Sequence, residues 1–319
     1  MKQTSNLKAR HTVYLFLTSL IWGSAFVAQS AGNVMGPFTF VSLRNYLGFF
    51  VLLPCILLLR GNFQISRDTL LGGISCGVIL CLASNVQQIS LLYTSPGKAG
   101  FITACYMVLV PIAGLFCGRG LKKRVAAAVF LAVVGLYFIC IPAREGFSGM
   151  NRGDLLCLCC AVLFTGHILC IDHFTERADG VKMSCIQFLV CALLSSGLMA
   201  VWEQPSLSGI RAGFIPLLYA GVLSSGVGYS LQIVGQKGVN PSVAALILSL
   251  ESCFAVLAGW LLLGSRLSLR EGLGCVIMFG AIVLTQLPEQ GEKEANVRDG
   301  KTADAGTTDV GTADSCERR

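Results

Sequence analysis

The chain has 319 residues, of which 54% are hydrophobic and only 13% are charged, and its formal net charge at pH 7 is +7. Soluble domains carry about 25% charged residues, and the mean hydropathy here is +0.70. These values exclude an ordinary soluble protein. We attribute the positive charge to membrane orientation and expect no nucleic-acid partner.

Long apolar segments follow one another along the chain, separated by short loops with turn-forming residues. A helix needs about 18 or more apolar residues to cross a bilayer core of about 30 Å. Ten segments approach or exceed this length: 12–30, 38–59, 70–92, 98–118, 125–142, 154–171, 182–201, 211–235, 241–263 and 270–287. They lack the alternation of membrane β-barrel strands, so we predict an all-α integral membrane protein with ten transmembrane helices. The first boundary is the weakest, because no charged residue separates spans one and two.

The two ends of the chain differ from the apolar segments between them. Residues 1–11 are predicted to form a cytoplasmic N-terminus, and the first apolar run is too long for a cleavable signal peptide. Residues 288–319 are rich in Glu, Asp, Gly and Thr and contain few large apolar residues. Such a composition predicts a disordered cytoplasmic tail.

The distribution of Lys and Arg predicts the orientation, because cytoplasmic loops are enriched in these residues. With the N-terminus inside, the predicted inner loops hold twelve Lys and Arg residues and the outer loops hold six, the tail being excluded. The strongest inner marker is the basic loop at 118–124. We therefore expect a multi-pass protein of the cytoplasmic membrane with both termini in the cytoplasm.

The chain contains 15 cysteines, most of which fall inside predicted spans. A buried thiol behaves there as a small hydrophobic group. Cys157, Cys159 and Cys160 form a cluster that could suggest a metal or redox site, but no second Cys/His cluster with zinc-like spacing accompanies it. We expect packing roles, with no metal, cofactor or disulfide.

The two halves of the chain can be aligned with a shift of 145 residues. Gln87 then falls on Gln232, Pro96 on Pro241, and Tyr106 on Glu251. Corresponding spans are five apart, which is an odd number, so they must cross the membrane in opposite directions. Inverted repeats of this kind are typical of secondary transporters. We predict a five-plus-five inverted-topology repeat with halves 12–142 and 154–287.

Several short motifs resemble those of a known family. Leu-Ile-Trp-Gly-Ser-Ala-Phe at 20–26 is similar to the opening motif of the drug/metabolite transporter superfamily, EamA type. Further similarities lie at 43–46, at 93–99, at Leu250-Glu251 and at 259–264. The resemblance covers roughly residues 12–287 and implies a permease of ten spans with a central cavity lined by both halves.

Two positions depart from the pattern of this family. Its members usually have Pro after the acid of span nine, where this chain has Ser252. They usually have an acidic residue after the last Gly of the following motif, where this chain has Ser265. The first departure puts a kink near Glu251 in doubt, and the second affects a loop contact.

Polar groups at membrane depth are costly and normally face the interior of the helix bundle. Glu251, near the middle of span nine, could contact a substrate amine, couple proton movement, or serve as a structural carboxyl. Arg44 could neutralise an anionic substrate, although we favour a structural role, because it is shallow enough to reach the outer interface or brace a neighbouring helix and because the family resemblance implies an arginine here whatever the cargo. His167, in the middle of span six, could bind substrate, but a neutral interhelical histidine is the stronger expectation.

Spans three and eight have the most polar surfaces in the predicted core. We expect Gln87 and Gln232 in the cytoplasmic half of these spans, with Tyr229 close by. Small residues at four-residue spacing in the same spans predict close helix approach. We expect these spans to line a cavity. Trp22 in span one could form an aromatic wall of that cavity or pack against a neighbour. Tyr106 is the repeat partner of Glu251, which would place the pair around the pseudo-twofold axis of the two halves.

No metalloprotease, nucleotide-binding or Ser/His/Asp pattern is found, so we expect no catalysis and no ATP-driven transport by this chain alone. The expected function is a secondary transporter that moves small organic metabolites or drugs, amino-acid-like solutes included, by alternating access. The resemblance favours export. The alternatives are an integral membrane enzyme acting on lipids and a membrane sensor. The expected partners are a small-molecule substrate and the lipid bilayer, with proton coupling a further expectation; the sequence is silent on oligomeric state.

Overall fold

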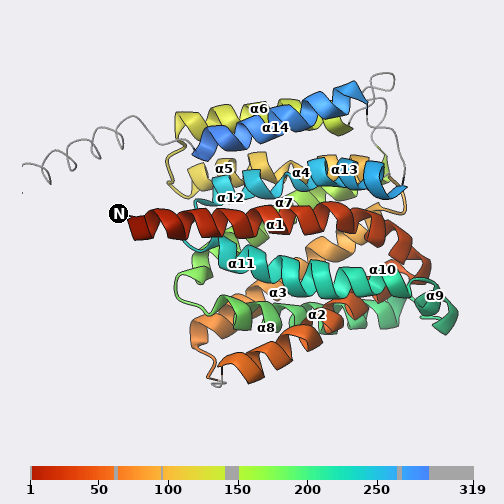
Figure 1. Ribbon diagram of the computed structural model, residues 1–319. Coiled ribbons are helices and arrows are strands. Elements are labelled where there is room, and N and C mark those ends of the chain that lie inside the picture. The colour runs from red at the N-terminus through yellow and green to blue at the C-terminus, as the bar shows by residue number, and fades with distance from the viewer. Residues whose placement is uncertain (1, 61–63, 95, 141–150, 264–267, 287–319) are drawn as a thin grey trace, which may run out of the picture.

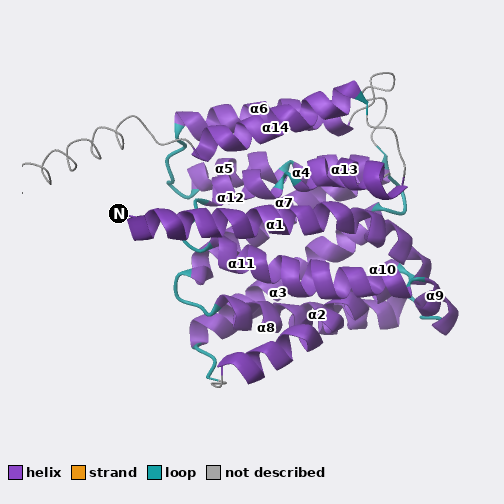
Figure 2. Cartoon of the chain, in the orientation of Figure 1, coloured by secondary structure: helices purple, strands orange, loops and turns teal. Residues whose placement is uncertain are grey.

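The computed structural model describes residues 2–60, 64–94, 96–140, 151–263 and 268–286. Within these residues the chain folds into helices and contains no strand (Figures 1 and 2). The first half contains α1 (Lys2–Gly32), η1 (Asn33–Met35), α2 (Pro37–Arg60), α3 (Arg67–Ser90), α4 (Pro96–Ala104), α5 (Tyr106–Phe116) and α6 (Lys123–Cys140). The second contains α7 (Arg152–Thr175), α8 (Gly180–Trp202), α9 (Leu207–Ala212), α10 (Phe214–Leu218), η2 (Tyr219–Tyr229), α11 (Ser230–Gln236), α12 (Pro241–Leu248), α13 (Glu251–Leu263) and α14 (Leu269–Gln286).

Each predicted span coincides with helical structure, and the uncertain first boundary is confirmed by η1 between α1 and α2. Eight segments of the described chain are long and apolar enough to cross a membrane. They are Ala9–Met35, Pro37–Leu57, Arg67–Ser90, Ala99–Phe116, Arg152–Thr175, Gly180–Trp202, Phe214–Gln236 and Pro241–Ala258. The protein is therefore a multi-pass helical membrane protein.

The fifth and tenth predicted spans correspond to α6 and α14, which are helices but are not among these eight segments. Both predicted spans run into residues outside the described part of the chain, at 141–142 and at 287. The total of ten spans therefore stays a prediction. The predicted tail at 288–319 also lies outside the described residues.

Helix ends are fixed by side chains that satisfy the free backbone N–H groups of the first turn. Asn151 and Asp154 form a capping box at the start of α7. Asn240 accepts a hydrogen bond from the Ser242 amide at 2.9 Å, directly before α12.

The start of α2 is capped from a distant part of the chain. The Glu203 carboxylate, at the end of α8, accepts hydrogen bonds from the amides of Phe38 at 2.9 Å and Thr39 at 2.8 Å. Gly36 precedes them with a φ of 96°, a conformation that favours glycine. An added Cβ there would lie 2.6 Å from a Glu203 carboxylate oxygen, so a larger residue at this turn would displace the carboxylate that caps α2.

Small residues allow helices to pack closely, as the sequence predicts for span three. A Cβ on Gly73 would lie 2.6 Å from Cβ of Ile186, and one on Gly77 would lie 2.7 Å from Cβ of Val190, so α3 lies close against α8. Because lipid is as apolar as these side chains, such packing is a main source of helix association in membranes.

Two helix pairs lie at opposite edges of the bundle in Figure 1. Helices α6 and α14 pack together at the upper edge, where an added Cβ on Gly274 would lie 2.6 Å from the Gly135 carbonyl oxygen. Helices α2 and α8 pack together at the lower edge, and α1 runs between the two pairs. The middle of the bundle is formed by α1, by the broken segments α4–α5 and α12–α13, and by the continuous segment η2–α11, and it is here that a cavity lies.

Candidate functional site

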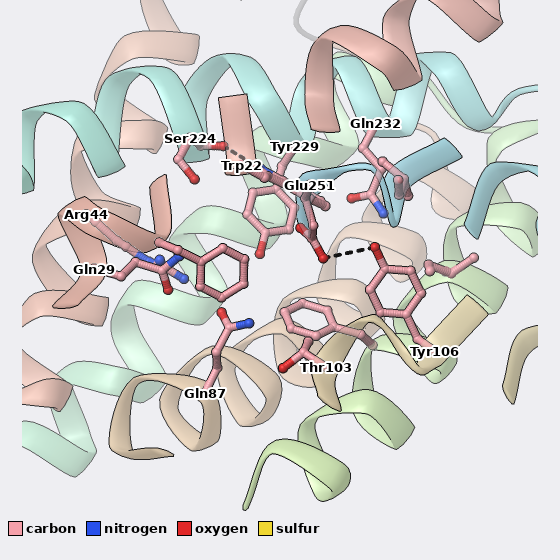
Figure 3. A pocket seen from close by; sticks show the side chains of 14 residues that line it. Trp22, Gln29, Arg44, Gln87, Thr103, Tyr106, Ser224, Tyr229, Gln232 and Glu251 are labelled. Carbon is pink, nitrogen blue, oxygen red and sulfur yellow. Dashed lines mark hydrogen bonds between the residues drawn. The ribbon is translucent and has the colours of Figure 1, made fainter. Parts of the chain in front are cut away.

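A cavity lies at the centre of the bundle and is lined by side chains from both halves of the chain (Figure 3). Seven of the eight residues singled out from the sequence contribute to its wall: Trp22, Arg44, Gln87, Tyr106, Tyr229, Gln232 and Glu251. The eighth, His167, does not. Seven polar or aromatic side chains from both halves of the chain thus line one cavity.

Two helix breaks position the acidic group of this cavity. One lies between α4 and α5, where Tyr106 is the first residue of α5. The other lies between α12 and α13, where Glu251 is the first residue of α13. The Tyr106 hydroxyl donates a 3.1 Å hydrogen bond to Oε1 of Glu251, and both side chains are buried. The break expected to be in doubt at Glu251, because Ser252 replaces proline, is therefore present.

Glu251 gains support from its place at the start of α13. The N-terminus of a helix carries a partial positive charge that stabilises a nearby carboxylate. The motif at 20–26 also reaches this point, because an added Cβ on Gly23 would lie 2.5 Å from the Glu251 carbonyl oxygen. Only a glycine in α1 allows the start of α13 to approach so closely.

Aromatic residues form one wall of the cavity. The rings of Trp22 and Tyr229 lie 4.5 Å apart between centroids, and Trp22 Nε1 donates to the Ser224 carbonyl oxygen at 3.3 Å. Ser224 and Tyr229 belong to η2, an eleven-residue π-helix. π-Helical stretches are rare and often occur at functional sites. Trp22 thus lines the cavity and also packs against Tyr229, so both expectations for it stay predictions.

Polar atoms without partners gather in the cavity. Four of its lining residues have a buried side-chain atom with no hydrogen-bond partner among the residues that the structure describes: Gln29 Oε1, Arg44 Nε, Thr103 Oγ1 and Gln232 Oε1. A buried polar group left unpaired costs about 1–3 kcal/mol. Their convergence on one cavity indicates a space that water or a polar ligand occupies.

The cavity wall also contains Gln29, Thr103, Phe26 and Phe164, which were not singled out from the sequence. Phe26 and Gln29 could have been found, because they lie four and seven residues after Trp22 and thus one and two helical turns along the same face, and Phe26 belongs to the motif at 20–26. Nothing comparable marks Thr103 or Phe164.

His167 lies behind the aromatic wall. Its Nε2 is 3.2 Å from Oε1 of Gln187 on α8, and its ring lies edge-on to Tyr229 at 5.9 Å. This interhelical arrangement is the stronger of the two expectations for His167. His167 therefore contacts the cavity wall through the ring of Tyr229, which lines the cavity.

The expectation that Gln87 and Gln232 share one half of the membrane is wrong. Next to Gln87, the Gln88 side chain donates to the Gln29 carbonyl oxygen near the end of α1. Close to Gln232, an added Cβ on Gly235 would meet the His11 carbonyl oxygen near the start of α1. The two amides therefore lie toward opposite ends of α1, which is the arrangement that an inverted repeat requires.

The cysteines of the sixth predicted span do not form a common site. Cys157 donates to Ser90 Oγ and Cys160 to the Ala83 carbonyl oxygen, while Cys159 is exposed. No group of three or more His, Cys, Asp or Glu side chains that could hold a metal ion occurs in the part of the chain that the structure describes.

Comparison with known proteins agrees with this architecture. Residues 11–141 and 151–287 each match the model of the EamA-like transporter family. An uncharacterized transporter of Archaeoglobus fulgidus is 32% identical over 276 residues, which cover 86% of this chain and 84% of that protein. The uncharacterized transporter YoaV of Bacillus subtilis is 21% identical over 82% of this chain and 91% of its own length.

A solved crystal structure shares the fold, with a TM-score of 0.74 at 18% identity, covering 87% of this chain and 96% of the other. At that identity the likeness concerns the fold alone. The family matches extend over nearly all of the helical part of the chain, and the motif at 20–26 lies inside the first of them. The chain is a member of the EamA-like transporter family of membrane transporters.

Proposed function

We propose that the protein is a secondary transporter that exports small organic metabolites or drugs across the cytoplasmic membrane by alternating access. Its two halves, residues 12–142 and 154–287, would each contribute five spans of opposite orientation and would rock around the central cavity. Amino-acid-like solutes are the leading substrate class, because the cavity combines aromatic walls with charged and amide groups.

The single observation that carries this proposal is the hydrogen bond between Tyr106 and Glu251. The two residues are 145 positions apart, which is the shift that aligns the halves. Each is the first residue after a helix break, and each break divides a segment that begins at a matched proline, Pro96 or Pro241. Broken helices that meet in the middle of the membrane are the usual substrate and ion sites of secondary transporters.

Further support comes from the helices that pack across the two halves. Under the same shift, α2 corresponds to α8 and α6 corresponds to α14, and each of these corresponding pairs is in contact. Contacts between like elements are expected where two similar units are related by a twofold axis.

Glu251 is the proposed coupling group. A carboxylate in a low-dielectric interior is costly, so a bound proton is a natural counter-charge when no cation occupies the site. Its only hydrogen-bond donor in the described part of the chain is the neutral hydroxyl of Tyr106. A bound substrate ammonium and a bound proton would each offset the cost of burying the Glu251 carboxylate. The two can therefore compete for the same group, which would allow the protein to exchange one for the other.

The direct test is a solute panel in proteoliposomes with and without an imposed proton gradient. We expect movement of small organic solutes that are recovered chemically unchanged, with a rate that depends on the gradient. Chemical conversion of a lipid or solute would instead identify a membrane enzyme. Binding without movement or conversion would identify a sensor.

A further inference from the structure

Arg44 is the charged side chain in this protein that is hardest to explain as a structural element. It lies on α2, only 2% of its surface is exposed, and its side chain lines the cavity. Its Nε has no hydrogen-bond partner, and no ion pair joins it to a carboxylate among the residues that the structure describes. Its Cζ lies 5.9 Å from the centroid of the Phe40 ring.

An unpaired guanidinium in this position is costly. Removing an ion from water without a partner costs several kcal/mol, and buried cations are therefore normally paired with acids. Two buried or half-buried acids on neighbouring helices are already engaged. Glu203 caps the start of α2, and Glu251 is bonded to Tyr106. The bracing role expected for Arg44 from the sequence would require bonds to a neighbouring helix that the described residues do not supply.

Arg44 brings a cationic hydrogen-bond donor to the cavity, and the Glu251 carboxylate lies apart from it. In Figure 3 the guanidinium lies beside Gln29 on one side of the cavity, with Gln87 facing the same space, whereas Glu251 and Tyr106 lie on the other side. The planar guanidinium fork matches a carboxylate group with two parallel hydrogen bonds. The opposite side offers acceptors, namely the Glu251 carboxylate and Oε1 of Gln232, which suit an ammonium group.

We propose that Arg44 binds the carboxylate of the transported solute and so restricts the substrates to organic acids, with zwitterionic amino acids held between Arg44 and Glu251. This inference rests on the proposed transport function. It specifies that the carboxylate lies toward Gln29 and that an amino group, where present, lies toward Glu251. The aromatic wall of Trp22 and Tyr229 takes the apolar part of the solute.

The test uses matched sets of solutes that share one hydrocarbon group. Each set contains an amino acid, the acid that lacks its amine, and the amine that lacks its carboxylate, for alanine, leucine and phenylalanine. Binding to the purified full-length protein in detergent is measured by calorimetry, and counterflow is measured in proteoliposomes. The variants are Arg44→Gln, which removes the charge, and Arg44→Lys, which keeps the charge without the fork.

Arg270→Gln is the matched control. Arg270 also has a buried Nε without a hydrogen-bond partner, but it lies on α14 over the rings of Tyr137 and Phe138 and does not line the cavity. Folding of every variant is checked by its helical circular dichroism signal and its elution volume. If Arg44→Gln fails to fold, Arg44→Lys carries the comparison.

We expect at least one acid or amino acid to bind, its matched amine to bind roughly tenfold more weakly or not at all, and Arg44→Gln to weaken the acid by about tenfold or more. The affinity of Arg44→Lys for the acid should lie between that of the unmodified protein and that of Arg44→Gln. Arg270→Gln should bind the acid as tightly as the unmodified protein. Equal binding of a carboxylate solute and its matched amine would overturn the inference, as would an unchanged affinity in Arg44→Gln or no binding of any carboxylate. Binding of acids that depends on Arg44, without counterflow of any of them, would refute the transport function while supporting the carboxylate site. Counterflow of amines alone would support the transport function and refute the carboxylate site.

Discussion

Glu251 lies where the two broken segments meet, and substituting it distinguishes a role in proton coupling from a role in substrate binding. Glu251→Gln keeps the shape of the side chain and its ability to accept from Tyr106 but removes the negative charge. We expect gradient-driven transport to fall by roughly tenfold, equivalent to about 1.4 kcal/mol, while exchange of solute at equal pH partly survives. Transport in proteoliposomes, measured with and without a gradient, checks this.

Tyr106→Phe is the companion variant, because it keeps the ring and removes only the donor. It should weaken transport less than Glu251→Gln does, since a neutral hydroxyl is lost rather than a charge. Equal losses of gradient-driven transport and exchange in Glu251→Gln would indicate that the carboxylate contacts substrate only. Normal rates in both assays would leave it a structural group.

At the scale of helices, Gly23 controls the distance between α1 and α13. An added Cβ would lie 2.5 Å from both the Glu251 carbonyl oxygen and Cβ of Phe254, so Gly23→Ala must separate the two helices. Overpacking of this kind costs about 1–3 kcal/mol. We expect a lower unfolding temperature in detergent and a reduced rate of transport, because the start of α13 carries Glu251.

Gly197→Ala on α8 is the control for this substitution. An added Cβ there meets nothing within 4 Å, and its position is exposed. Alanine is favoured over glycine inside a helix by about 1 kcal/mol, so this variant should be as stable as the unmodified protein or slightly more stable. A Gly23→Ala variant that matches it in both assays would show that α1 and α13 tolerate separation.

The sequence predicts the helical segments well because hydrocarbon thickness fixes their length and exposed backbone is excluded from lipid. It also predicts the meeting of Tyr106 and Glu251, since a shift that aligns two inverted halves brings equivalent residues near their common axis. The exact place of the breaks was not predictable. The break before Tyr106 has no proline or glycine at Ala104 or Cys105, and it depends on contacts with distant helices.

Two further features depend on tertiary structure in the same way. The missing partner of Arg44 can be recognised only when all neighbouring helices are in place, so its sequence position near the interface suggested a bracing role. From the sequence, Glu203 lies in a loop between two predicted spans. In the structure it caps a helix that begins more than 160 residues earlier. Such long-range pairings leave no periodic signal.

For the molecule as a whole, the basic loops gather at one end. In Figure 1 the start of α1 lies at the left, as do the loops between α5 and α6, α7 and α8, and α11 and α12, whereas η1 and α9 lie at the right. His11 near the start of α1 also bonds the Lys237 carbonyl oxygen. Because Lys and Arg favour the cytoplasmic side, we predict that the left end faces the cytoplasm.

Cysteine labelling tests this orientation. Gly120 and Gln204 are both exposed; Gly120 belongs to the loop between α5 and α6 at the left of Figure 1, and Gln204 belongs to the segment that leads from α8 into α9 at the right. In a cysteine-free background, a maleimide that does not cross membranes should label Gln204→Cys on whole cells and label Gly120→Cys only after the cells are permeabilised. The opposite pattern would invert the molecule, and labelling of both positions from outside would contradict the proposed topology.

The hydrogen bond between Tyr106 and Glu251 also sets a limit on how the two halves can be exchanged. If both halves descend from one duplicated unit, that unit paired with a copy of itself and placed identical residues face to face at these positions. Two ionised carboxylates so close would repel one another, so an unlike pair can arise only in a chain that joins two different halves. A dimer of either half alone would meet through two phenols or two acids. The joint exchange Tyr106→Glu with Glu251→Tyr should therefore preserve more transport than Tyr106→Glu alone, because it restores one donor and one acceptor with their origins reversed.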